Sequence, residues 1–277
     1  MQRYRFTDGT AVVTGAASGI GAALAAGLAE RGSHLVLLDR DAEGLARVAE
    51  DIGRTCPVRI ATYVADLADA EQTRRIGDTL ATAHPDTTLL INNAGVAIGG
   101  TFDQVTAEQF DTVLAVNLHA VITLTRALLP VLTTHPGAHL VTLSSVFGIV
   151  GPPGQTAYCT SKFAVRGFTE SLRGELTPAG VGVTCVHPGG VRTGIARNAM
   201  VGEGVPPSAA ARLAEFDKLL TLDPADAATA ILRAVERRKP RVLVGRDALV
   251  LETLARLLPV THRRLLGAAT RHAARRG

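Results

Sequence analysis

Several residue types are scarce in this sequence of 277 residues, which has no tryptophan, three tyrosines and three cysteines. Cys56, Cys159 and Cys185 lie far apart and form no Cys-x-x-Cys pair, so we expect free thiols in a reducing compartment and no metal site. No apolar stretch approaches the ~18 uninterrupted residues of a membrane-spanning helix, and the N-terminus lacks the apolar core of a signal peptide. These absences predict a cytoplasmic protein.

Acidic residues are missing from the C-terminus, because residues Thr253–Gly277 contain six arginines and no Asp or Glu. The formal net charge is +4, so the rest of the chain is slightly acidic and we expect no binding to nucleic acid. Hydrophobic residues make up 47% of the sequence and charged residues 19%, which supports a sizeable core. With no linker or internal repeat, the length is typical of one α/β domain.

The first motif is a glycine-rich turn between an apolar strand, Thr10–Thr14, and an Ala- and Leu-rich helix, Ile20–Arg31. A second strand, His34–Arg40, ends in an acidic residue about twenty residues after the turn, which is typical of a dinucleotide-binding unit. The N-terminus of the helix would offer free N–H groups and positive dipole to a pyrophosphate. An ordinary loop between strand and helix is the alternative interpretation.

The residues of this unit have separate physical reasons. Gly15 permits a tight turn, Gly19 lets the backbone approach a pyrophosphate, and Gly21 lets the helix pack closely on the strand. Asp39 can accept hydrogen bonds from the adenosine ribose, and its charge would repel a 2′-phosphate. We therefore expect NAD in preference to NADP, a preference that the neighbouring Arg40 would weaken.

Strands and helices alternate through most of the remaining chain. This alternation predicts an α/β fold: a Rossmann-like, doubly wound, mostly parallel sheet with helices on both faces, in a single domain. The predicted strands are Val58–Val64, Thr88–Gly95, His139–Ser144, Val181–His187 and Arg241–Gly245, and the predicted helices are Asp41–Ile52, Asp69–His84, Thr106–Thr134, Tyr158–Thr177 and Asp223–Lys239.

A candidate catalytic group lies in the middle of the chain. Tyr158 and Lys162 are four residues apart on a predicted helix, which places both side chains on one face. A positive charge beside a phenol lowers the pKa of the tyrosine from about 10 toward the range of an efficient general acid or base. Ser145 could hydrogen-bond a substrate oxygen held beside the tyrosine. Asn117 is unfavourable in mid-helix, so it is either tolerated there or placed for chemistry. Alone, the Tyr–Lys pair could equally lie on a solvated face.

Together these motifs resemble the short-chain dehydrogenase/reductase family over residues 8–245. His187 departs from the family pattern, in which Asn is more usual, and we interpret it as a structural residue. The motifs that carry the resemblance are Thr14-Gly15-Ala16-Ala17-Ser18-Gly19-Ile20-Gly21, Asn92-Asn93-Ala94-Gly95, Asn117, Ser145, Tyr158-x-x-x-Lys162 and Pro188-Gly189-x-Val191-x-Thr193.

The resemblance implies an NAD(P)-dependent enzyme that interconverts a secondary alcohol and a ketone through four catalytic residues. Tyr158 would exchange a proton with the substrate oxygen, and Lys162 would lower the tyrosine pKa and bind the nicotinamide ribose. Ser145 would hold the substrate oxygen, and Asn117 would anchor a water in a proton relay to Lys162.

The resemblance also implies the cofactor contacts. It places Asp66 and Leu67 beside the adenine, Ile20 at the pyrophosphate, and Val191 and Thr193 at the nicotinamide carboxamide. The full predicted cofactor set is Gly15, Ser18, Gly19, Ile20, Gly21, Asp39, Arg40, Asp66, Leu67, Asn93, Ala94, Gly95, Tyr158, Lys162, Pro188, Gly189, Val191 and Thr193.

We divide the chain into a dehydrogenase domain of residues 1–246, with a substrate lid at about 194–222, and a basic helical extension of residues 247–277. The loop after Ser145 and the lid are mostly apolar, which predicts a hydrophobic alcohol or ketone such as a lipid, steroid or alicyclic compound. The extension could contact an anionic membrane surface or pack on a neighbouring subunit. The resemblance implies a homodimer or homotetramer built through the long helices.

Two other functions stay open. One is an NADPH-dependent ketoreductase of lipid or carrier-linked substrates, with Arg40 at the 2′-phosphate, and Asp39 counts against it. The other is a non-catalytic dinucleotide-binding sensor or scaffold, which would be expected to lack Ser145, Tyr158 or Lys162.

Overall fold

The computed structural model describes residues 2–207 and 220–261 of the chain. Its central sheet has seven parallel strands in the order β3-β2-β1-β4-β6-β7-β9, and a small second sheet pairs β5 with β8. The strands are β1 (Thr10–Thr14), β2 (His34–Asp39), β3 (Ile60–Val64), β4 (Thr87–Asn92), β5 (Ile98–Gly99), β6 (His139–Leu143), β7 (Gly182–Pro188), β8 (Met200–Val201) and β9 (Arg241–Val244).

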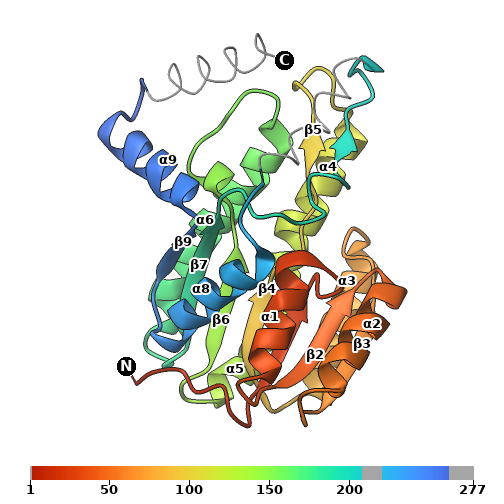
Figure 1. The fold of residues 1–277 in the computed structure, drawn as a ribbon, viewed down its shortest axis with the longest axis vertical. Helices are drawn as coiled ribbons and strands as arrows, with labels where there is room; N and C mark the ends of the chain where they lie inside the picture. The colour runs from red at the N-terminus through yellow and green to blue at the C-terminus, as the bar shows by residue number, and fades with distance from the viewer. Residues whose placement is uncertain (1, 208–219, 262–277) are drawn as a thin grey trace.

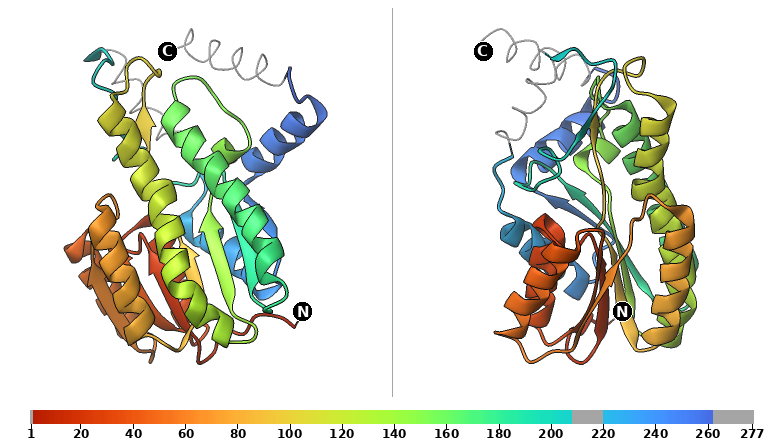
Figure 2. Two further views of the ribbon diagram at one scale, coloured as in Figure 1. Left: turned by 180° about the vertical axis from the view of Figure 1, so that it is seen from behind. Right: turned by 90° about the vertical axis from the view of Figure 1, so that its right-hand side faces the viewer.

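Helices cover both faces of the sheet (Figures 1 and 2). One layer contains α1 (Gly19–Ala29), α2 (Ala42–Gly53) and α8 (Pro224–Glu236). The opposite layer contains α3 (Ala70–Ala83), α5 (Ala120–Thr134) and α6 (Thr156–Leu176). The remaining helices are α4 (Ala107–Leu114), the π-helical turn η1 (Ala115–His119), the 3-10 turn η2 (Val146–Gly148) and α9 (Arg246–Leu257). The predicted doubly wound, single-domain α/β fold is therefore confirmed.

Alternation along the strands explains the two-sided core. Val13 and Leu37 face the layer of α1, α2 and α8, whereas Val12 and Leu38 face the layer of α3, α5 and α6, and all four side chains are buried. Because both faces are covered, these strands are apolar at every position rather than at every second one.

The predicted helix Thr106–Thr134 is not one uninterrupted α-helix. It consists of α4, the turn η1 and α5, and η1 contains Asn117. The Asn117 side chain hydrogen-bonds Val96 rather than its own helix. Such π-helical turns are frequent at functional sites. The sequence also gave no indication of the β5–β8 pair, whose strands are only two residues long.

The run from Ala107 to Thr134 is long and apolar enough to cross a membrane, by length and composition alone. Length and composition alone do not show that the helix crosses a membrane. In its most apolar stretch of 18 residues, 44% is buried inside the protein. The side chains of Leu124, Leu128 and Leu132 pack in the core beneath the sheet. One face of this run therefore belongs to the protein core.

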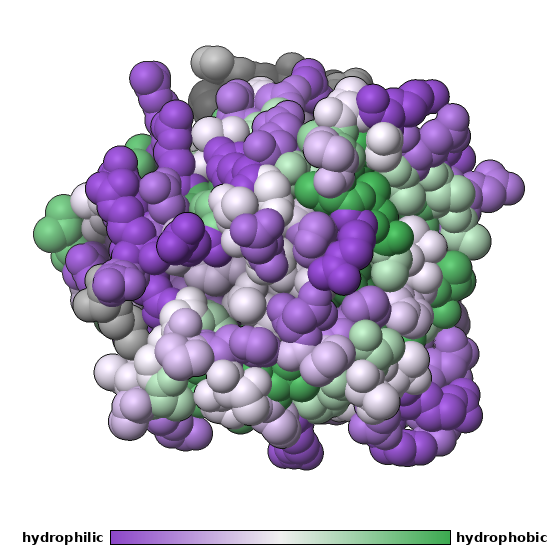
Figure 3. All heavy atoms as spheres, turned by 90° about the horizontal axis from the view of Figure 1, so that it is seen from below, coloured by the Kyte–Doolittle hydropathy of each residue, from purple (hydrophilic) through white to green (hydrophobic). Residues whose placement is uncertain are grey.

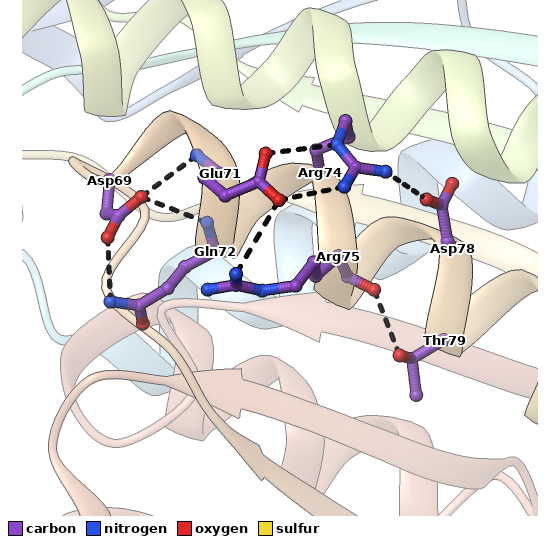
Figure 4. Close-up of polar contacts among 7 residues, drawn as sticks. All are labelled: Asp69, Glu71, Gln72, Arg74, Arg75, Asp78 and Thr79. Carbon is purple, nitrogen blue, oxygen red and sulfur yellow. Dashed lines mark hydrogen bonds and ion pairs between the residues drawn. The ribbon is translucent and has the colours of Figure 1, made fainter.

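Helix α3 shows how the outer surface of that layer is stabilised (Figure 4). The Asp69 carboxylate accepts hydrogen bonds from the backbone N–H groups of Glu71 and Gln72 and so caps the helix. Arg74 bridges Glu71 and Asp78 at 2.8 and 2.9 Å. These pairs are exposed, so solvent screens them and each is expected to contribute little to stability.

The end of the molecule that carries the N-terminus is mostly hydrophilic, with smaller hydrophobic areas between the polar residues (Figure 3). A hollow of about 440 Å³ lies there, lined by residues that include Arg3, Tyr4 and Arg238. None of the predicted site residues lines it, because they follow the opposite, carboxyl ends of the strands.

Candidate active site

The predicted site residues gather at the carboxyl edge of the central sheet. The glycine turn follows β1, Asn93 follows β4, Ser145 follows β6, and Pro188 ends β7. Strand order reverses between β1 and β4, and the crevice at such a reversal is where α/β sheets bind ligands.

The glycine turn has the geometry expected of a close approach. Gly15 and Gly19 have φ of +66° and +55°, in the left-handed region that favours glycine. A Cβ at Gly21 would lie 1.9 Å from the carbonyl oxygen of Gly15, so no side chain fits there. The turn and α1 therefore pack against each other only because these positions lack side chains.

The N-terminus of α1 is suited to an anion. Its N-cap, Ser18, makes no side-chain hydrogen bond, whereas the N-caps Asp41, Asp69 and Asp223 of α2, α3 and α8 all accept backbone N–H groups. The first N–H groups of α1 are thus left without a side-chain acceptor beside a cradle that a Cβ would fill. The residues present fit a dinucleotide pyrophosphate.

Asp39 ends β2 next to this turn. Its carboxylate accepts hydrogen bonds from the backbone N–H groups of Ala17 at 3.0 Å and Asp41 at 3.1 Å. Each carboxylate oxygen can accept a further hydrogen bond, so a ribose hydroxyl can still donate to it. The neighbouring Arg40 side chain is exposed.

Asn93 and Ala94 connect the end of β4 to the glycine turn. The Asn93 amide donates to the carbonyl oxygens of Thr14 at 2.8 Å and Gly15 at 3.1 Å. The hydroxyl of Thr14 accepts the backbone N–H groups of Asn93 and Ala94, both at 3.0 Å. The Asn93 side chain therefore holds the turn, and Thr14 is a supporting residue to which sequence analysis gave no role.

The two residues predicted at the adenine lie between β3 and α3. The Asp66 carboxylate accepts the N–H of Ala68 at 2.9 Å and so forms its own turn. The Leu67 side chain is buried in the core beside α3 and α5. Only the backbone of Leu67 is therefore suited to a ligand contact.

Tyr158 and Lys162 lie on one face of α6, as predicted, with the Lys162 Nζ 5.6 Å from the centre of the tyrosine ring. Lys162 is 3% exposed and donates to the carbonyl oxygen of Leu143 at 3.0 Å. Burial lowers the pKa of Lys162 to about 8.

The pKa of Tyr158 is raised, whereas the sequence predicted that Lys162 would lower it. Desolvation raises the pKa of its hydroxyl to about 12, and the Ser145 hydroxyl offsets only part of that rise. The phenol is therefore protonated at neutral pH in this arrangement, because burial disfavours the charged phenolate.

Ser145 is the serine that faces the tyrosine. Its hydroxyl oxygen accepts the N–H of Phe147 at 3.1 Å at the start of η2, and the hydroxyl also hydrogen-bonds the Tyr158 side chain. The hydroxyl of Ser144 instead donates to the carbonyl oxygen of Lys162 at 2.8 Å. Ser144 thus ties the strand to α6, in agreement with the choice of Ser145 for chemistry.

Asn117 lies beside the lysine but is held by protein groups. Its amide oxygen accepts the N–H of Val96 at 2.8 Å, and its amide nitrogen donates to the carbonyl of Val96 and the hydroxyl of Ser161. A Cβ at Gly95 would lie 3.2 Å from the Asn117 Oδ1 and 3.3 Å from the Lys162 Nζ. Gly95, Asn117 and Lys162 are therefore close neighbours, and the relay through Asn117 stays a prediction.

The loop after β7 closes the other side of the crevice. A Cβ at Gly19 would lie 3.1 Å from the Thr193 side chain, so this loop reaches the glycine turn. The N–H of Gly190 donates to Asp247 of α9 at 2.6 Å, and Val191 is buried under the loop. Nothing in the sequence pointed to Asp247, which is 57 residues away.

Only some of the apolar residues in the loop after Ser145 and in the lid can contact a substrate. Val146 and Val150 are buried in a cluster with Ala248 and Leu251 of α9, so they support the loop rather than line a pocket. Met200 packs with Ile98 and Phe110 above the site, because β8 pairs with β5. The predicted lid positions Phe216 and Leu219 lie outside the described residues.

Comparisons with known proteins agree with this geometry. The short chain dehydrogenase family model matches residues 9–203. Putative oxidoreductase SadH of Mycobacterium tuberculosis is 38% identical over 266 residues, which cover 95% of each chain.

Two solved structures are also similar. A short-chain dehydrogenase/reductase from Burkholderia phymatum in complex with NAD has a TM-score of 0.82 and 30% identity, covering 94% of this chain and 97% of that one. A short-chain dehydrogenase from Sphingobium yanoikuyae in complex with NADPH has a TM-score of 0.76 and 27% identity, covering 94% and 95%. The chain thus belongs to the short-chain dehydrogenase/reductase family of NAD(P)-dependent oxidoreductases.

Proposed function

We propose that this oxidoreductase interconverts a secondary alcohol and a ketone, with Tyr158 as the acid or base. The observation that carries the proposal is the convergence of Tyr158, Lys162 and Ser145 beside the glycine cradle. The dinucleotide supplies or accepts the hydride when it is bound.

The chain's own residues would manage the proton and the substrate oxygen. The Tyr158 hydroxyl, protonated at neutral pH, is in the correct state to donate to a carbonyl oxygen during reduction. The Ser145 hydroxyl, which hydrogen-bonds the Tyr158 side chain in this structure, would donate to the same oxygen and orient it. The Lys162 ammonium, at a pKa of about 8, would stabilise the phenolate that forms.

NAD is the proposed cofactor, and NADP is the alternative. The half-buried Asp39 carboxylate is held beside the turn by the N–H groups of Ala17 and Asp41. Rotating it away from a 2′-phosphate would break both hydrogen bonds. Val191, Thr193 and the N–H groups at the start of α1 would hold the rest of the cofactor.

A hydrophobic substrate fits the apolar character of the region above Tyr158. Phe147 stands edge-on to the tyrosine ring at 6.2 Å, and Val96, Phe110 and Met200 pack around Ile98 nearby. Such surroundings favour a ketone with an apolar body over a short polyol.

A spectrophotometric screen of alcohols and ketones with each cofactor tests this proposal. We expect turnover of bulky apolar ketones or alcohols, and a kcat/KM for NADH roughly tenfold or more above that for NADPH, because the Asp39 charge opposes a 2′-phosphate. Preference for short polyols would contradict the proposed substrate class. NADH binding without any turnover would favour the sensor or scaffold instead.

Replacing Asp39 with Ala tests whether the Asp39 carboxylate is the cause of the preference for NADH over NADPH. The variant should lose most of the discrimination against NADPH while the KM for the ketone stays unchanged. If the wild-type protein already prefers NADPH, the ketoreductase function with Arg40 at the 2′-phosphate is the better description.

We also propose a cytoplasmic homodimer or homotetramer built through the long helices, as the family resemblance implies. Phe163, on α6, is 42% exposed although it is a large apolar side chain, which is consistent with a covered face in an oligomer. Analytical ultracentrifugation measures the assembly directly.

The outer face of α9 supports the proposal of contact with an anionic membrane. Leu249, Val250 and Leu257 are 55%, 57% and 73% exposed there, and the exposed Arg246 and Arg256 flank them. The sequence of residues 262–277 adds further arginines and no acid. Apolar side chains with flanking cations are suited to an anionic lipid surface.

Co-sedimentation with vesicles tests that contact. We expect binding to vesicles that contain phosphatidylserine and loss of binding at high salt, because the attraction between charges is screened. Deleting residues 262–277 or replacing Leu249 and Leu257 with Ser should weaken it. Equal binding to neutral vesicles, or a change of oligomeric state in these variants without any lipid effect, would contradict the proposal.

A further inference from the structure

A buried histidine contacts the backbone of the proposed catalytic serine. His187, in β7, is 0% exposed, and its Nδ1 lies 3.0 Å from the carbonyl oxygen of Ser145. A carbonyl oxygen can only accept, so Nδ1 must carry the proton and donate. The other ring nitrogen, Nε2, then has a lone pair and no hydrogen-bond partner among the described residues.

The histidine is also uncharged. Burial lowers the pKa of His187 to about 4, and the nearby Arg241 and Arg166 act in the same direction. The hydrogen bond to the Ser145 carbonyl, and to a smaller extent Glu170, offset only part of this fall in the pKa. A neutral ring with one unpaired nitrogen fills this space less favourably than an apolar side chain of similar size. The hydrogen bond to Ser145 is the interaction that an apolar side chain would not provide.

Two further contacts hold the loop from Ser144 to Gly148 in place. The Ser144 hydroxyl donates to the carbonyl oxygen of Lys162 at 2.8 Å. A Cβ at Gly148 would lie 2.7 Å from that carbonyl, so the loop sits directly against α6. The carbonyl oxygen of Ser145 accepts two hydrogen bonds, from the backbone N–H of Gly148 at 2.9 Å within the turn η2 and from the Nδ1–H of His187 at 3.0 Å. His187 provides the one that comes from the sheet, outside the turn.

We infer that His187 is a positioning residue for Ser145: its Nδ1–H fixes the Ser145 carbonyl and thereby the direction in which the serine hydroxyl meets the substrate oxygen. The inference rests on the proposed function, because it assigns to His187 an effect on the step in which Ser145 takes part.

The test compares His187→Asn with His187→Leu. The Nδ2 of Asn is attached at the same point as the Nδ1 of His, so it can donate to the same carbonyl, whereas Leu cannot. We expect His187→Leu to lower kcat roughly tenfold or more through misplacement of the serine, with NADH binding unchanged. His187→Asn should keep kcat within about threefold of the wild type. Equal kcat values for the two variants would overturn the inference.

A double-mutant cycle shows whether the effect passes through Ser145. In a Ser145→Ala background, His187→Leu should lower kcat no further, because no hydroxyl is left to position. An equal fall in both backgrounds would contradict the inference. Absence of turnover in the wild type would instead contradict the proposed function.

His139→Leu is the matched control for stability. His139 is likewise 0% exposed and has one unpaired ring nitrogen among the described residues. It lies at the end of β6 opposite to Ser145 and hydrogen-bonds Thr184 of β7. The His139→Leu variant should have a changed melting temperature and an unchanged kcat. A crystal structure of His187→Leu gives a readout that does not depend on activity, since the Ser145 peptide plane should rotate. An unchanged plane would overturn the inference.

Discussion

Replacing Tyr158 with Phe is expected to lower kcat by roughly 10³-fold, the scale of a lost general acid or base. The substitution removes only the hydroxyl and keeps the ring that stands edge-on to Phe147 at 6.2 Å. The fold and the glycine cradle are untouched, so NADH should bind with nearly the wild-type affinity. Steady-state kinetics and NADH fluorescence titration measure the two quantities separately.

Tyr63→Phe is the control for this substitution. The Tyr63 hydroxyl hydrogen-bonds His84 at 2.9 Å beside the edge strand β3, several strands away from α6, so its loss should leave kcat unchanged. Turnover by Tyr158→Phe at the wild-type rate would mean that another group exchanges the proton, and the proposed mechanism would then be wrong.

The second large effect concerns acid stability. Burial lowers the pKa of His139 to about 3 and that of His187 to about 4, whereas an unfolded histidine has a pKa of about 6.5. Below pH 6.5 the unfolded chain therefore binds protons that the folded chain does not, and stability falls as the pH falls. From the two shifts, the free energy of unfolding should decrease by about 3 kcal/mol between pH 6.5 and pH 5.

Urea denaturation across this range measures the decrease. Carboxylates with lowered pKa values, such as Asp69 and Glu71, stabilise the fold until the pH falls below this range. The decrease between pH 6.5 and pH 5 is therefore assigned to the histidines. His139→Leu should remove about half of the pH dependence. A free energy of unfolding that stays constant from pH 6.5 to pH 5 would show that both histidines can be protonated in the folded protein.

The sequence by itself determined the fold and the order of the site residues along it. Apolar strands that alternate with amphipathic helices predict a covered parallel sheet, because each pattern is local and repeats with the geometry of its element. The spacing of Gly15, Gly19 and Gly21 predicted the turn, and the four-residue spacing of Tyr158 and Lys162 predicted their common face. These features need no knowledge of distant contacts.

Only the tertiary structure decided how the side chains are used. The Asn93 amide holds a turn 79 residues earlier, His187 contacts Ser145 across 42 residues, and Asp247 contacts Gly190 across 57. Burial reversed the expected direction of the Tyr158 pKa, and Val146 and Val150 became support for the loop under α9. The reason is physical: desolvation and hydrogen-bond partners depend on which segments fold against each other, and no local periodicity carries that information.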